Sequence, residues 1–121
     1  MTDITSFTYV QDAIGMAEHE PDRIKPVSVL KATGANVVVF NFDAGTELRE
    51  HTAQHPALLQ ALAGVLNVSV GGQTFQLRPG DLLHIEPFVP HSVTAVGQGK
   101  LQLTVLMIDS PGPSKVPLSE G

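Results

Sequence analysis

The sequence predicts an all-β protein built from short antiparallel strands. After Pro26 the chain divides into apolar or β-branched runs of five to nine residues, separated by glycine, proline and polar turn residues. Gly71-Gly72 stands between two alternating runs, as the two-residue turn of a β-hairpin does. Roughly eight or nine strands at this spacing are typical of an antiparallel sandwich or barrel.

Residues 1–26 form a segment that precedes the strand pattern. Between Tyr9 and His19, the side chains of Ala13, Met16 and Ala17 recur at near-helical spacing, and Pro21 ends the pattern. We therefore expect a short helix or an irregular segment here, packed outside the core.

Residues 27–109 carry the expected strands. A chain of 121 residues has the length of a single domain, so we expect these strands to form one. Further reversals at Arg78-Pro79-Gly80 and Gly97-Gln98-Gly99 indicate that most connections are antiparallel. Residues 110–121 are rich in proline, glycine and serine, which favours a flexible tail over a strap that crosses a partner subunit. The expected strands are 27–31, 36–42, 46–51, 57–62, 65–70, 73–77, 81–86, 91–96 and 100–108.

Composition excludes several classes of function. A net charge of -5, with 7 Lys and Arg and no basic run, offers no surface for nucleic acid or an anionic membrane. The absence of cysteine excludes disulfides and thiolate ligands, and the first residues carry no secretory signal, so we expect a cytoplasmic protein. No nucleophile elbow, phosphate-binding loop or dinucleotide fingerprint is present, which argues against acyl transfer and nucleotide chemistry.

Two segments each carry a histidine at a fixed offset from a turn glycine. They are GTELREHTAQHPALLQALAG, from Gly45 to Gly64 with His51, and GDLLHIEPFVPHSVTA, from Gly80 to Ala95 with His91. Because both segments are expected to contain strands, a barrel can bring the two imidazoles to one place.

These segments resemble the two motifs of the cupins, G(x)5HxH(x)3-4E(x)6G and G(x)5PxG(x)2H(x)3N. The resemblance covers about residues 44–108 and implies a small antiparallel jelly-roll barrel. In the family, two histidines and a glutamate of the first motif and one histidine of the second hold a divalent metal, so the resemblance implies Zn, Fe, Ni or Mn as a candidate cofactor.

This chain departs from that ligand set. Ala53 and Ala57 stand where the family has the second histidine and the glutamate, and Ala95 replaces the final asparagine. Glu86 and Phe88 replace the proline and glycine of the second motif. Two imidazoles alone hold a divalent cation weakly, so a metal centre here needs a third ligand.

His55 is the candidate third ligand, which gives His51, His55 and His91 as the metal set. Pro56 disfavours helical backbone at His55, so a helical pair of ligands is the wrong description. The alternative is that His55 is a solvated turn residue.

Without a metal, His51 and His91 would hydrogen-bond each other, a water molecule or an acidic ligand. In that case the affinity for small acids should depend on pH. Glu47 and Arg49 share the strand parity of His51, so they are expected to continue its inward row, and Arg49 would suit a carboxylate substrate. The alternative is a salt bridge on the surface.

Small residues are expected to leave room beside the histidines. Ala53, Ala57, Leu59 and Ala61 share the parity of His51, which predicts a roomy apolar pocket for a ligand with a hydrophobic body. The opposite face of the same run carries apolar side chains outside the barrel, which favours a homodimer. The outward residues are Leu58, Gln60 and Leu62.

Three other charged or titratable residues are assigned no function. His84 is expected on the face opposite Leu83 and Ile85, as a surface or interface histidine. Glu86 is read as a solvated charge at the end of a strand, and His19 as a surface residue.

The sequence leaves three classes of function open. The first is a metal-dependent oxygenase, isomerase or lyase that acts on a small organic acid or aromatic compound. The second is a non-catalytic module that binds a small molecule in the barrel, which the missing ligands favour. The third is an interaction protein that uses only its outer sheet.

Overall fold

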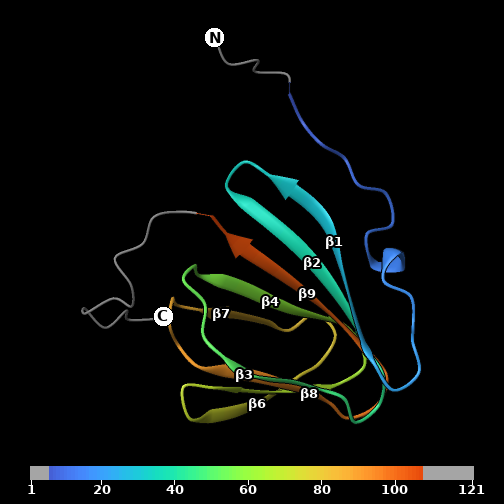
Figure 1. Cartoon of the computed structure of the whole chain (residues 1–121), viewed down its shortest axis with the longest axis vertical. Coiled ribbons are helices and arrows are strands. Elements are labelled where there is room, and N and C mark those ends of the chain that lie inside the picture. The colour runs from blue at the N-terminus through green and yellow to red at the C-terminus, as the bar shows by residue number, and fades with distance from the viewer. Residues whose placement is uncertain (1–5, 108–121) are drawn as a thin grey trace.

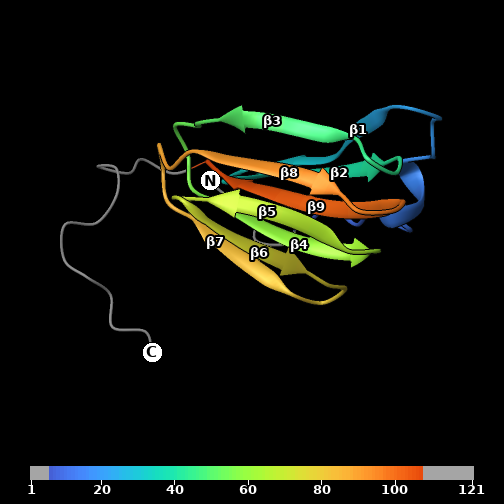
Figure 2. The same ribbon diagram turned by 90° about the horizontal axis from the view of Figure 1, so that it is seen from below.

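The computed structural model describes residues 6–107, which form two antiparallel sheets packed face to face (Figures 1 and 2). The five-stranded sheet has the order β1-β2-β9-β4-β7, and the four-stranded sheet has the order β3-β8-β5-β6. The strands are β1 (Ile24–Ala32), β2 (Ala35–Phe42), β3 (Glu47–His51), β4 (Ala57–Ala63), β5 (Leu66–Val70), β6 (Gln73–Leu77), β7 (Leu82–Ile85), β8 (His91–Ala95) and β9 (Gly99–Leu106).

The all-β jelly-roll fold is confirmed, and each expected run forms a strand. The first strand begins at Ile24 rather than Val27, because residues 24–26 pair with the end of β2. The proposed tail, residues 110–121, lies outside the described residues.

The core lies between the two sheets, where alternate side chains of each strand point inward. β4 contributes Ala57, Leu59 and Ala61, while β8 contributes Val93 and Ala95. This period of two is the alternation that the sequence showed for half-buried strands. The other buried members of the cluster are Phe42, Leu66, Val68, Leu77, Ile85 and Leu101.

A second, smaller cluster lies on the outer face of the five-stranded sheet. Val29 of β1 and Val39 of β2 pack there against Ala17, which is completely buried, and Leu62 lies at the edge. The N-terminal segment therefore covers part of this face, as expected (Figure 1).

Of the two expectations for the N-terminal segment, the irregular one is observed. Among residues 6–107 the only helical element is a single 3-10 turn, η1 (Ile14–Met16). Asp12 has a φ of 53°, in the left-handed region that a helix cannot continue through, and Ala17 is already extended. The apolar spacing reflects burial of Ala17 on the sheet, with no continuous helix.

Gly64 closes the first histidine segment by a turn that only glycine fits. Its φ is +71°, and a Cβ atom there would lie 2.3 Å from the carbonyl oxygen of Gln98. This close approach brings the end of β4 against the start of β9 and fixes one end of the barrel.

No helix in the described part of the chain is long and apolar enough to cross a membrane.

Candidate functional site

His51 and His91 lie side by side at one end of the barrel. They are paired across β3 and β8, and their ring centroids are 4.3 Å apart at an interplanar angle of 61°. His91 has the inward parity of Val93 and Ala95 and is 7% exposed, whereas His51 is exposed. The pair therefore forms a rim site, with one buried and one accessible imidazole.

A shift in strand register brings His51 to this position. Leu48 pairs with Val93 and His51 pairs with His91, so three steps along β3 match two steps along β8. An extra residue of this kind is a β-bulge, and it reverses the parity of the residues beyond it. Leu48 packs on the core, and the bulge lets His51 follow it on the same side of the sheet.

The inward row expected from His51 through Arg49 and Glu47 is therefore not observed. Both side chains are exposed, because Leu48 takes the inward position on this part of β3. Arg49 contributes its backbone carbonyl to the site, through the hydrogen bond from His51. Its guanidinium takes no part in that contact.

Each imidazole is held by a backbone carbonyl two residues earlier in the chain. The Nδ1 of His51 lies 2.9 Å from the oxygen of Arg49, and the Nδ1 of His91 lies 2.9 Å from the oxygen of Val89. A carbonyl oxygen only accepts, so each Nδ1 carries the hydrogen of that bond. In the neutral ring the Nε2 then has a free lone pair that can accept a proton or a hydrogen bond.

Two loops frame the histidine pair. Residues 52–56 follow His51 and residues 86–90 precede His91, and the N–H of Phe88 donates to the carbonyl of Ala53 at 2.8 Å. Both loops lie at the same end of the molecule (Figure 2). Phe88 is 54% exposed, so an aromatic ring stands at the rim. Ala53 itself lies in the loop, beyond the end of β3.

The residues expected to line a roomy pocket pack into the core instead. Ala57 and Leu59 face inward, as predicted, but they belong to the buried cluster that fills the space between the sheets. Three cavities among residues 6–107 are lined by other side chains. A ligand of the histidine pair would therefore lie at the rim.

The described residues do not form the three-histidine metal set. No three His, Cys, Asp or Glu side chains within residues 6–107 are arranged to hold one ion. His55 is partly buried in the loop before β4, and its Nδ1 is buried with no hydrogen-bond partner in the structure. With alanine at positions 53 and 57, the two-imidazole donor set does not fit the metal centre that the family motif implies.

The structure places the two remaining residues on β7 and in the loop that follows it. His84 is exposed on β7, on the face opposite Leu83 and Ile85, as expected. Glu86 is partly buried in the loop before His91, where its backbone carbonyl accepts a hydrogen bond from the N–H of Val89.

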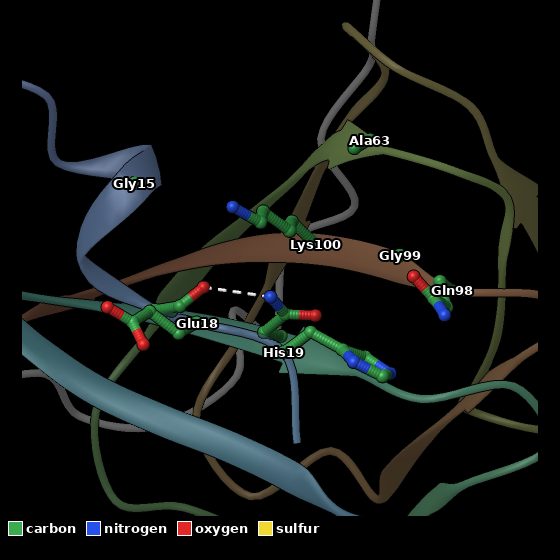
Figure 3. A pocket seen from close by; sticks show the side chains of 9 residues that line it. Gly15, Glu18, His19, Ala63, Gln98, Gly99 and Lys100 are labelled. Carbon is green, nitrogen blue, oxygen red and sulfur yellow. Dashed lines mark hydrogen bonds between the residues drawn. The ribbon is translucent and has the colours of Figure 1, made fainter. Parts of the chain in front are cut away.

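His19 is more than the surface residue that the sequence indicated. Its Nε2 lies 2.9 Å from a carboxylate oxygen of Asp43, and the ring lines a cavity of about 480 Å³ on the outer face of the five-stranded sheet (Figure 3). Hydrogen bonds from His19 and from the backbone N–H groups of Asp22 and Ala44 hold the pKa of Asp43 below its ordinary value of 3.8. No local pattern reveals this pair, because 24 residues separate its members.

A model of the cupin domain matches residues 38–108 of this chain. No curated protein matches the chain in sequence.

Solved structures agree on the architecture. A conserved protein of unknown function from Streptococcus pyogenes superposes with a TM-score of 0.75 at 20% identity, over 87% of this chain and 92% of that one. An RmlC-like cupin from Desulfovibrio desulfuricans gives 0.74 at 21% identity, over 83% and 97% of the two chains. KdgF from Halomonas sp. gives 0.69 at 18% identity, over 86% and 97%. At these identities the likeness shows the fold alone.

Proposed function

The chain belongs to the cupin family, and on that basis we propose that it binds a small organic acid at the His51–His91 pair, without a metal held by the protein. The observation that carries the proposal is the arrangement of the two imidazoles, whose Nδ1 atoms are both committed to backbone carbonyls.

The chemistry of the pair suits a ligand that brings an acidic proton. A neutral imidazole with hydrogen on Nδ1 accepts that proton at Nε2, and the resulting cation donates a charge-assisted hydrogen bond to the carboxylate. Once a ring is protonated, its Nε2–H can donate to a carboxylate oxygen, and two rings with centroids 4.3 Å apart can reach the two oxygens of one carboxylate. His91 is held by its buried surroundings, so the exposed ring of His51 is the one that can adjust to the ligand.

The rim also offers an apolar contact for the body of the ligand. Phe88 stands on the loop whose next residue, Val89, holds the ring of His91 through its carbonyl. An acid with a flat or hydrophobic body gains contact area there that acetate lacks.

Titration with benzoate tests this proposal, with benzamide as the uncharged ligand of the same shape. We expect benzoate to shift the ring resonances of His51 and His91 in NMR spectra, with an affinity that weakens as the pH rises from about 5 to about 8 because the shared proton is lost. His51→Gln should abolish the shift at His91. His84→Gln, which removes an exposed histidine on β7, should leave it unchanged.

An affinity for benzoate that is equal to that for benzamide, or independent of pH, would contradict binding by a shared proton. Our second candidate is a metal-dependent enzyme, and its support is that both Nε2 atoms are free for coordination. Metal analysis of the purified protein distinguishes this candidate from a metal-free binding site. Stoichiometric metal that is lost in His51→Gln and in His91→Gln would favour that candidate over ours.

A further inference from the structure

A cavity lies on the opposite side of the five-stranded sheet from the core, under the N-terminal segment. It is bounded by Gly15 and residues 17–19, by Asn41 of β2 and Ala63 of β4, and by residues 98–100 at the start of β9 (Figure 3). None of these residues belongs to the histidine pair or its loops. We propose that this cavity is a second binding site, for a small organic carboxylate.

The cavity has the size of a small-molecule site, and the side chains that line it are mostly small. Its volume of about 480 Å³ falls within the usual range of roughly 300 to 1,000 Å³ for ligand pockets. Four of its nine lining residues are glycine or alanine, so no large side chain fills the space. These are Gly15, Ala17, Ala63 and Gly99.

Lys100 supplies the positive charge that a carboxylate needs. Its ammonium donates to the carbonyl of Ile14 at 3.1 Å, which fixes its position and leaves two of its three N–H groups available. Within residues 6–107 it makes no salt bridge, so its charge is not neutralised by a carboxylate of the described chain. An unpaired cation that lines a cavity favours an anionic occupant.

His19 adds a second polar group to the lining, whose free nitrogen accepts a hydrogen bond in the neutral ring and donates one to a carboxylate only when the ring is protonated. Asp43 accepts from Nε2 and so fixes the ring, which leaves Nδ1 as the free nitrogen. The Asp43 carboxylate is satisfied by this bond and by the N–H of Asp22, and it does not line the cavity. The imidazole therefore separates this carboxylate from the cavity.

Two amide side chains complete the polar lining. Asn41 is only 5% exposed, and its Nδ2 donates to the carbonyl of Ala17 at 2.8 Å, so it holds the N-terminal segment over the cavity. Gln98 lies at the other end of the cavity in Figure 3. The one acidic residue in the lining, Glu18, points its carboxylate away from the His19 ring in the same view.

Binding at this site is read from the ring resonance of His19, which separates it from binding at His51 and His91. We expect benzoate to shift that resonance saturably and benzamide to leave it unchanged. Lys100→Gln should weaken the affinity for benzoate about tenfold, because a charge-assisted hydrogen bond is lost. Lys31→Gln, the same change at an exposed lysine of β1, should alter it less than about twofold.

Ala63→Trp tests the site without touching the contacts that hold the N-terminal segment. Ala63 is exposed at the end of β4, opposite Lys100, so a tryptophan there fills the cavity and should abolish the His19 shift while the protein stays folded. A His19 shift that survives Ala63→Trp, or a His19 resonance that benzoate never moves, overturns the proposal. Neither result bears on the His51–His91 site.

Discussion

At the scale of single residues, the strongest local conflict is Phe88, which has a φ of 67°. The left-handed region is costly for a residue with a Cβ atom, by about 1 to 2 kcal/mol, and glycine is the residue that usually occupies it. The second cupin motif has glycine at this position, and the backbone found here explains why. This chain keeps the backbone and places an aromatic ring on it, beside the loop contact that holds His91.

Strain of this kind is expected to reverse the usual order of protein stability between an alanine and a glycine variant. At an ordinary position glycine is less stable than alanine, because it loses more backbone freedom on folding. At position 88 both substitutions remove the same ring, but only Phe88→Gly removes the Cβ atom. We expect Phe88→Gly to be more stable than Phe88→Ala by about 1 kcal/mol in urea denaturation. The opposite order would show that the backbone relaxes there without cost.

At the scale of elements, the strands were predictable and the placement of single side chains on them was not. Alternation holds along residues 91–95, where His91 shares the inward parity of Val93 and Ala95, because β8 pairs regularly with β5. The same rule placed Arg49 inward and failed, because the bulge between Leu48 and His51 adds a residue that no sequence pattern announces. The expectation that His51 lies beside His91 rested on the glycine offsets and the family resemblance, and not on parity.

The N-terminal segment shows the same limit. Its attachment to the sheet depends on Asn41, His19 and Asp43, whose partners are distant in sequence. Apolar spacing indicated a short helix or an irregular segment here and could not decide between them. Burial of one small residue, Ala17, against β1 and β2 accounts for the apolar spacing without a helix.

The hydrogen bonds of Asp43 should make this attachment depend on pH. Because its pKa is lowered in the folded protein, chiefly by the hydrogen bond from His19, ionised Asp43 stabilises the fold above its ordinary pKa of 3.8. That contribution is lost as the pH falls through the lower folded-state pKa. We expect Asp43→Asn to lower the free energy of unfolding near about pH 7 and to match the natural chain in strong acid.

The control for Asp43→Asn is a second carboxylate that does not hold the N-terminal segment. Glu47→Gln removes an exposed charge on β3 and should change stability by no more than about 0.5 kcal/mol at either pH. A difference between Asp43→Asn and the natural chain that persists in strong acid would mean that charge is not what Asp43 contributes.

At the scale of the whole molecule, the outer face of the five-stranded sheet is only partly covered. The N-terminal segment lies over the β1–β2 side, where Leu62 also finds its contacts. Beyond it, Leu82 of β7 has the outward parity of His84 and is 64% exposed, beside Gln60 of β4. We therefore propose, as the sequence indicated, that two copies associate, and we place the contact on the β4–β7 side of this face.

Sedimentation of the purified protein tests this association. We expect a dimer at micromolar concentrations and a monomer for Leu82→Lys, because a lysine there would face its own copy across a two-fold interface and the like charges repel. Phe75→Gln is the matched control, since Phe75 is 43% exposed on β6 of the other sheet and should leave the dimer intact. A natural chain that sediments as a monomer would refute the association. A dimer that dissociates with Phe75→Gln and survives Leu82→Lys would move the interface to the β6 edge, because that strand presents its unpaired backbone groups there.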